Sequence, residues 1–409
     1  MNNPDVYVLG SYGQWLSRII PDDPRPLSFR HSRWSDIEAW RKTARSEVDR
    51  HLAKPATDKP PTVRKERQYE YDGLEIEELS WKLPYGPGTR AVFMKPAGCR
   101  ERIPGILGLH DHSGNKYFGK RKIVRTSERP HPMISEHHRN YYGGAAWANE
   151  LAKRGFAVLV HDVFPFGSRK VTASDLPPQV VERMMRPPEM VGELSVRELS
   201  QEGRITRYDV PGDEPDESIR LYNAFGRQHE DIIAKSLFSA GLTWPGVFLA
   251  EDQQALSYLV SRGDVDPDRI GCCGLSGGGL RTDYLAGLDD RIKCSVTVGF
   301  MTTWRDLALY VCHTHTWMVY IPLLAQQMDF PEILGLRAPL PSMVLYTDED
   351  PLFSLEEVKM AVGLLDEVYM KAGAAEAFQA KMHKGPHKFD MPMQRDAFAW
   401  LERWLKTRP

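Results

Sequence analysis

Residues 269–279, RIGCCGLSGGG, decide the fold class of this chain. The first five letters form a short apolar run typical of a buried strand, and residues 279–287 have the pattern of a helix. Between the two, Gly274-Leu-Ser-Gly-Gly278 places Ser276 in a tight strand-to-helix turn. Residues two positions before and after such a serine must be small to avoid a collision, and glycine occupies both positions. The stretch therefore predicts a nucleophile elbow, and its flanks make a chance serine turn the weaker interpretation.

Short apolar runs of the same kind recur along the chain, and each is typical of a strand buried on both faces. They are residues 105–109, 156–160, 269–273, 294–298 and 342–346, with a last strand at 377–382. Segments with helical periodicity fall between or after them, at 144–154, 247–262, 354–373 and 393–406. Ser354 and Glu357 have the spacing of a capping box at the start of the third. This alternation predicts an α/β fold with a mostly parallel sheet and right-handed crossovers.

The organisation of the chain suggests one large catalytic domain with an extension before it. Residues 1–68 are expected to form an N-terminal helical extension and linker, with a helix at 37–52 capped by Ser35-Asp36. Residues 69–409 form the predicted catalytic domain, which opens with antiparallel strands over 69–96. Insertions at about 116–142 and 165–244 interrupt the alternation, and loops of this length in a compact domain are usually lids or substrate-binding elements.

Composition limits the classes of partner and the compartment. The 53 basic and 55 acidic residues give a net charge of −2, which argues against nucleic acid or an anionic membrane surface as the main partner. The N-terminus lacks the pattern of a secretory signal, and no apolar run has the length of a membrane span. Five cysteines, an odd number, suggest core residues in a reducing compartment. We expect a cytoplasmic protein, and its oligomeric state, including a homo-oligomer, stays open.

Two further groups complete a catalytic triad if the serine is a nucleophile. The expected chain order is Ser, then Asp or Glu, then His, with each residue just past a strand. Asp350 is preferred to Asp348 because it stands farther into the loop and precedes a proline. His387 is preferred to His383 because it lies in a Gly-Pro turn that can lean back over Ser276. The backbone N–H groups of Gly277 and His112 are the expected oxyanion donors.

Several runs resemble one branch of a known superfamily. The chain resembles the acetyl-xylan-esterase-like, dienelactone-hydrolase-related branch of the α/β hydrolases over roughly residues 75–409. The runs that carry the resemblance are LGLHDHSG, ELAKRGFAVLVHDVFPFGSR, DRIGCCGLSGGG, FMTTWRDLALYVCHTHTWM and GPHKF. The resemblance implies Ser276, Asp350 and His387 as the triad, and ester hydrolysis without a cofactor. Asp111 stands where the family's His-Gly oxyanion motif has glycine.

Three other features of the sequence each have a plainer explanation than a role at the site. The pairs His110-X-His112 and His313-X-His315 could chelate zinc, but the first coincides with the oxyanion loop, so no metal is expected. In the aromatic segment 303–320, core packing accounts for about half of the aromatic and histidine residues. The remainder is expected to wall the acyl or sugar site, and the substrate-binding candidates are His315, Trp317 and Trp304.

The basic loop is assigned to solvent rather than to an anionic substrate such as an acidic sugar or a coenzyme A thioester. Its residues are Lys116, Lys120, Arg121, Lys122, Arg125 and Arg129.

We therefore predict a serine carboxylic ester hydrolase that acts on short-chain, acetyl-like esters, including those of carbohydrates. A lactone hydrolase or acyl-CoA thioesterase with the same triad, and an inactive hydrolase-fold binding protein, remain alternatives. A peptidase is disfavoured because the extension is too short for a large gating domain.

Overall fold

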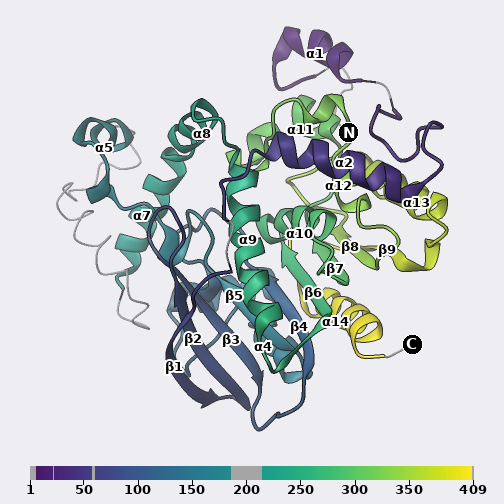
Figure 1. Ribbon diagram of the computed structural model, residues 1–409. Helices are drawn as coiled ribbons and strands as arrows, with labels where there is room; N and C mark the ends of the chain where they lie inside the picture. Colours follow the sequence, from purple (N-terminus) through teal and green to yellow (C-terminus); the bar gives the residue numbers. More distant parts are fainter. Residues whose placement is uncertain (1–5, 22, 58–59, 186–213, 408–409) are drawn as a thin grey trace.

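The computed structural model describes residues 6–21, 23–57, 60–185 and 214–407. Within these residues nine strands form one sheet of order β1-β2-β3-β5-β4-β6-β7-β8-β9 (Figure 1). The strands are β1 (Arg64–Tyr71), β2 (Leu74–Trp81), β3 (Thr89–Pro96), β4 (Ile103–Leu109), β5 (Ala157–His161), β6 (Val265–Leu275), β7 (Cys294–Val298), β8 (Ser342–Thr347) and β9 (Phe378–His383). β1, β2, β3 and β5 pair antiparallel, and the pairs from β5 through β4 to β9 are parallel.

The predicted α/β class is therefore confirmed. β7 has the predicted bounds, whereas β6 begins at Val265 rather than at residue 269. The helices among the described residues are α1 (Gly13–Ile19), α2 (Ile37–Leu52), α3 (Pro132–Tyr142), α4 (Trp147–Lys153), α5 (Pro178–Met185), α7 (Asp216–Gln228), α8 (Glu230–Ser239), α9 (Trp244–Ser261), α10 (Gly277–Leu288), α11 (Trp304–Leu309), α12 (Pro331–Gly335), α13 (Leu355–Lys371) and α14 (Met391–Leu405).

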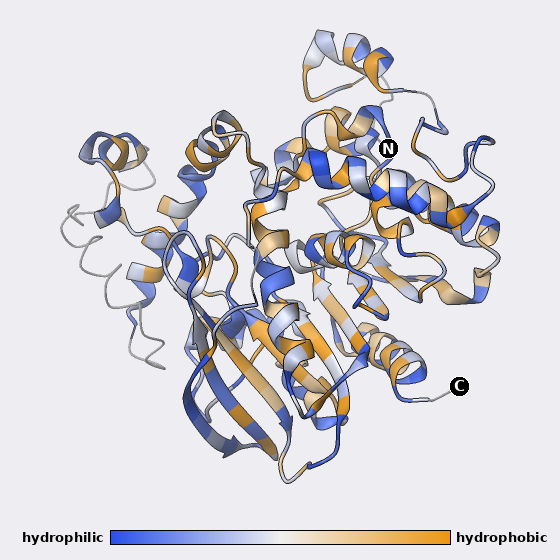
Figure 2. Ribbon diagram, in the orientation of Figure 1, coloured by the Kyte–Doolittle hydropathy of each residue, from blue (hydrophilic) through white to orange (hydrophobic). Residues whose placement is uncertain are grey.

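The sheet separates two apolar cores. In the central strands successive residues face opposite sides, so Ile106 and Leu107 of β4 belong to different cores, as do Val344 and Leu345 of β8. One core packs against α4 and α14, and the other against α2, α9, α10, α12 and α13. Figure 2 shows the outer strand β1 as largely hydrophilic and the central strands as largely hydrophobic. A charged edge strand of this kind resists pairing with another chain.

Helix α2, in the predicted N-terminal extension, shares the larger of these cores. Its bounds are those predicted, and the Asp36 carboxylate caps it by accepting the Glu38 N–H at 2.9 Å. Trp40, Ala44 and Val48 face inward and are fully buried. The Asp36 cap sets the start of the helix, and the regular spacing of its apolar residues places them on one face, which packs into the core.

The capping box predicted at α13 is wrong in its contacts. Ser354 occupies the N-cap position, but its side chain makes no capping hydrogen bond. The Glu357 carboxylate instead accepts from the Thr303 hydroxyl at 2.6 Å, and the Ser354 N–H donates to Asp306 at 3.1 Å. Tertiary partners thus replace the local pair that the spacing suggests.

The two insertions form a small core of their own beside the sheet. Tyr117, Phe118 and Ile134 from the first pack with Ile219 and Phe225 from α7 of the second. Residues 186–213 of the second insertion lie outside the described residues. No single helix in the described part is long and apolar enough to cross a membrane, and only the bent pair Asp216–Ser239 and Trp244–Ser261, with an 87° bend, meets that length and composition when the two are taken together.

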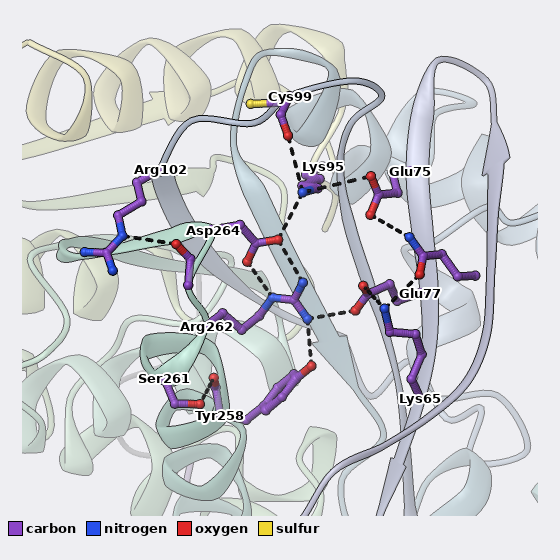
Figure 3. Close-up of polar contacts among 12 residues, drawn as sticks. Lys65, Glu75, Glu77, Lys95, Cys99, Arg102, Tyr258, Ser261, Arg262 and Asp264 are labelled. Atoms are coloured by element: carbon purple, nitrogen blue, oxygen red, sulfur yellow. Dashed lines mark hydrogen bonds and ion pairs between the residues drawn. The ribbon is translucent and has the colours of Figure 1, made fainter.

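A network of ion pairs joins the antiparallel edge of the sheet to the end of α9 (Figure 3). The Arg262 guanidinium donates to Glu77 and to the Tyr258 hydroxyl at 2.7 Å each, and to both oxygens of Asp264 at 2.9 Å. It also lies 3.6 Å from the centroid of the Phe93 ring. Burial works against the Asp264 carboxylate, but the pairs with Arg262 and Lys95 lower its pKa to about 2.

Arg262→Leu is expected to lower the free energy of unfolding by about 3 kcal/mol, because it removes one of the two cations that pair with the buried Glu77 carboxylate and leaves only Lys65. Denaturant titration at pH 7 measures the loss. Because the pKa of Asp264 is depressed, the part of the effect due to Asp264 should disappear as the pH falls below its unfolded value toward 2. Arg102→Leu is the control, since Arg102 is exposed and donates to the Gly263 carbonyl at 3.0 Å. Equal losses for the two variants would contradict the argument.

Candidate active site

Ser276 stands between the end of β6 and the start of α10, as the motif predicts. Its backbone has φ 59° and ψ −119°, a conformation that residues with a Cβ rarely adopt. Two backbone hydrogen bonds hold it there: its N–H donates to the Val298 carbonyl at 2.9 Å, and its carbonyl accepts from the Leu280 N–H at 2.9 Å. The turn presents the serine side chain at the carboxyl edge of the sheet.

The glycines on either side of the serine allow a close approach of backbones. A Cβ at Gly278 would lie 2.1 Å from the Leu109 carbonyl oxygen, and one at Gly274 would lie 2.6 Å from the same atom. Both distances are far below contact, so the small residues inferred from the motif are required sterically. A Cβ at Gly277 would lie 3.1 Å from the backbone nitrogen of His112. The two expected oxyanion donors are therefore neighbours.

Asp350 and His387 meet although 37 residues separate them. Asp350 follows β8 and His387 follows β9, and the His387 Nδ1 lies 2.6 Å from Asp350 Oδ2. The other carboxylate oxygen of Asp350 accepts from the Leu352 N–H at 3.0 Å, which fixes its rotamer. The His387 Nε2 is buried and has no hydrogen-bond partner among the described residues. That nitrogen can therefore accept a hydrogen bond or a proton from a hydroxyl group.

The two competing residues face elsewhere. Asp348 Oδ1 accepts the Gly385 N–H at 2.8 Å, so this carboxylate braces the turn that carries His387. His383 Nε2 lies 2.9 Å from Asp396 of α14. The geometry thus places Asp350, rather than Asp348, against His387, and leaves His383 outside the cluster.

A cavity of about 310 Å³ opens over the serine. It brings together Ser276, His387, both expected oxyanion residues and one of the three expected substrate-binding residues, His315. Its walls are Asp111, His112, Ser113, Gly114, Tyr141, Leu275, Ser276, Gly277, Leu280, Phe300, Thr314, His315, Thr316, Met318, Pro351, Leu352 and His387. Tyr141 had no signal in the sequence, since it lies in an insertion without a motif.

Neither predicted tryptophan lines this cavity. Trp304 is 5% exposed and packs edge-on against Phe330, with ring centroids 5.3 Å apart, so it belongs to the core. Trp317 is 41% exposed and packs edge-on against Tyr320. His315 lies 4.8 Å from the Phe353 ring centroid, and burial lowers its pKa to about 4. It is therefore a neutral imidazole at physiological pH.

The side chain of His112 is held from the second insertion. Its Nδ1 accepts from the Gly114 N–H at 3.0 Å, so Nε2 carries the proton and donates to Glu230 at 2.9 Å. Glu230 also accepts from Lys116 and from the Thr316 hydroxyl. Burial opposes ionisation of Glu230, but the contacts with His112 and Lys116 lower its pKa. One carboxylate thus joins α8 to the oxyanion loop and to the cavity wall.

The interpretation of the basic loop as a solvated segment is wrong for its three lysines. Lys116, Lys120 and Lys122 are buried, and they pair with Glu230, Asp162 and Asp111 respectively. Arg121 pairs with Glu214 at 2.7 Å, and Arg129 is exposed. The three lysine ammonium groups thus form buried ion pairs within the fold, and their spacing in the sequence does not reveal this.

The histidine pairs do not assemble a metal site in the described part of the chain, where no group of three or more His, Cys, Asp or Glu residues could hold a metal ion. The His110 ring packs against Phe166 with centroids 5.1 Å apart, while His112 turns to Glu230. His313 and His315 face different surroundings, since only His315 lines the cavity over the serine.

Comparisons with known proteins agree with this architecture. A family model described as the prolyl oligopeptidase family matches residues 243–408, which carry Ser276, Asp350 and His387. "Putative hydrolase YtaP" of Bacillus subtilis (strain 168) is 25% identical over 375 residues, which cover 89% of this chain and all of YtaP.

Two solved structures extend the likeness over nearly the whole chain. A putative acetyl xylan esterase from Bacteroides fragilis has a TM-score of 0.63 at 16% identity, covering 94% of this chain and 84% of its own. A glucuronoyl esterase from Solibacter usitatus has a TM-score of 0.60 at 12% identity, covering 94% and 98%. At these identities the likeness establishes the fold.

Proposed function

We propose that this chain, a member of the α/β-hydrolase superfamily, is a serine carboxylic ester hydrolase that works through an acyl-enzyme. The observation that carries the proposal is that the candidate catalytic groups lie together at one cavity. Ser276 and Gly277 at the elbow, His112 in the loop after β4, and the His387–Asp350 pair at 2.6 Å in the loops after β9 and β8 gather at one cavity. Nucleophilic catalysis by serine needs a base, a group that orients the base, and an oxyanion site, and each has a candidate here.

In the proposed mechanism His387 Nε2 accepts the proton of the Ser276 hydroxyl as its oxygen bonds to the ester carbonyl carbon. Asp350 holds Nδ1–H and stabilises the imidazolium that forms. Collapse of the tetrahedral intermediate breaks the bond to the alcohol, which leaves with the proton from His387. Water then attacks the acyl carbon while His387 takes a proton from it. The bond to Ser276 breaks, His387 returns the proton to the serine oxygen, and the carboxylic acid is released. No cofactor enters either half-reaction.

The negative charge on the intermediate is assigned to the N–H groups of Gly277 and His112. Gly277 is the first residue of α10, a helix of 12 residues, so the positive end of its dipole lies at the same place. Donors fixed before the reaction stabilise charge that develops only in the transition state. His315, neutral and buried in the cavity wall, is the proposed contact for a polar atom of the substrate.

The size and lining of the cavity favour a short, uncharged acyl group. Leu275, Leu280, Phe300 and Met318 give it apolar walls, and its volume of about 310 Å³ is at the small end for ligand pockets. No lysine or arginine stands among the described residues of the lining, which favours a neutral ester over a coenzyme A thioester. Acetylated carbohydrates are the proposed substrates, in keeping with the name of one solved structure that shares the fold, a putative acetyl xylan esterase.

A series of p-nitrophenyl esters tests the substrate proposal. We expect kcat/KM to be highest for acetyl to butyryl and lower by at least about tenfold at C8, because each added methylene must fit into a cavity of about 310 Å³. Acetylated xylan should release acetate. Met318→Ala, which enlarges the cavity, should move the optimum to longer chains, and Met360→Ala, on the exposed face of α13, should not.

Three results would contradict the proposal. An optimum at C8 or longer would refute the small pocket. Faster hydrolysis of acyl-CoA would favour a thioesterase. Faster hydrolysis of a prolyl peptide anilide would favour a peptidase, the activity named by the matching family model.

A further inference from the structure

Lys122 is a fully buried ammonium directly behind the oxyanion loop. It ends the helical turn η2 (Lys120–Lys122) and donates to the carbonyl oxygens of Asp111, of His112 at 3.2 Å and of Asn115 at 3.3 Å. Its Nζ lies 3.5 Å from the Asp111 carboxylate. Burying a charge in this way costs several kcal/mol unless every proton finds an acceptor. Here the acceptors are backbone carbonyls of the loop itself, which ties the ammonium to the loop's conformation.

The Asp111 carbonyl has a special relation to the oxyanion donor. The carbonyl of Asp111 and the N–H of His112 belong to one planar trans peptide group, in which C=O and N–H point in opposite directions. A cation that holds the carbonyl on one side therefore aims the N–H to the other, where Gly277 lies. Donation to the carbonyl also polarises the amide and makes its N–H a stronger donor.

The loop is fastened on its other side as well. The Arg281 guanidinium, paired with Asp252 at 2.6 Å, donates to the carbonyl of His110 at 3.3 Å. The Asp111 carboxylate accepts from the Tyr142 hydroxyl and from His137 at 3.2 Å. Burial opposes its charge, but Lys122 and His137 hold the pKa of Asp111 well below its usual value. This carboxylate, at the position where the resembling family has glycine, is thus the counter-ion of Lys122.

We propose that Lys122 is a positioning residue of the oxyanion hole: its ammonium, neutralised by Asp111, holds the Asp111 carbonyl so that the His112 N–H is aimed at the oxyanion. The inference rests on the proposed esterase function and deepens it. Lys122 does not touch substrate and acts through one peptide group.

Lys122→Met keeps an unbranched side chain, one atom shorter, and removes the charge. We expect kcat for p-nitrophenyl acetate to fall about 30-fold, less than the loss from removing a donor outright, with KM changed by less than about threefold. Affinity for a trifluoromethyl ketone with the same acyl group, which forms a tetrahedral adduct, should fall in parallel with kcat/KM. Lys120→Met is the matched control. It removes a buried ammonium of the same turn that pairs with Asp162, so it should lower the thermal midpoint and leave kcat within about threefold.

Asp111→Asn supplies a second test, which can be carried out even if Lys122→Met does not fold. Burial lowers the pKa of Lys122 to about 8, with Asp111 as the main opposing group. Activity of the wild type should therefore decline as the pH rises through 8, and Asn should move that decline to lower pH. His110 also faces this site, since its Nδ1 lies 3.0 Å from the Asp111 carbonyl oxygen. The other titratable or charged groups around Lys122 are His112, Lys116, His137, His138, Tyr142 and Arg281.

Each result has a defined meaning. A kcat within threefold of wild type for Lys122→Met, a rise confined to KM, an equal kcat loss in Lys120→Met, or an unmoved alkaline limb in Asp111→Asn would overturn the inference. If the wild type hydrolyses no ester and Ser276 takes no fluorophosphonate label, the proposed function fails, and the inference falls with it.

Discussion

Ser276→Ala should abolish esterase activity, with a fall in kcat of about 10⁶-fold, the scale seen when a serine hydrolase loses its nucleophile. Alanine keeps the Cβ and the backbone hydrogen bonds of the turn, so the thermal midpoint should change little. Intact-mass spectrometry after a fluorophosphonate probe should give one adduct on the wild type and none on the variant, because only an activated serine reacts.

Ser113→Ala is the control for this experiment, because Ser113 is the other serine in the wall of the cavity. It should retain the adduct. Labelling that persists in Ser276→Ala, or that maps to a different serine, would end the serine-hydrolase proposal while leaving the fold assignment intact.

Asp350→Asn should lower kcat by about 10⁴-fold, on the scale of the corresponding change in a serine protease. The carboxylate accepts Nδ1–H of His387 at 2.6 Å, which leaves Nε2 unprotonated and able to take the serine's proton. An asparagine amide can donate to Nδ1 and so favour the opposite tautomer. Steady-state kinetics with a short-chain ester measures the loss, and the thermal midpoint reports whether the fold is kept.

Asp348→Asn is the matched control, two residues away on the same loop. Asparagine keeps the oxygen that accepts the Gly385 N–H at 2.8 Å, so the turn before His387 should survive and kcat should change by less than about tenfold. If Asp348→Asn proves the more damaging of the two, the acid of the triad is Asp348 and the geometry around His387 must differ in solution.

The parts that sequence predicts well are those that local chemistry determines. The central strands are continuous apolar runs because both faces are buried, and the elbow glycines are required by close approach to Leu109. The α2 cap is an Asp that accepts a backbone N–H two residues on. For the cap the two atoms lie two residues apart. For the strands and the glycines the packing partners lie far along the chain, but the packing demands an apolar or small residue at each position, so the residue types in the local sequence still show it.

The parts that it misses depend on contacts between distant segments. Glu230 lies 118 residues from His112, in an insertion without a motif, and nothing near it in the sequence marks it as a partner of the oxyanion loop. The run of basic residues indicates a solvated loop, whereas in the structure Lys122 is buried and donates to carbonyl oxygens of the oxyanion loop. The aromatic segment 303–320 predicts Trp304 at the site, whereas in the structure Trp304 packs against Phe330 in the core.

The backbone of the elbow also sets a limit on how stable this protein can be. A non-glycine residue at φ 59° and ψ −119° raises the free energy of the native state by about 1–3 kcal/mol. That is a sizeable share of the 5–15 kcal/mol by which domains are typically stable. Selection for thermal robustness alone would relax this turn, for example with glycine, and in doing so would remove the proposed nucleophile. The strained serine is therefore a point where stability and activity are in direct opposition.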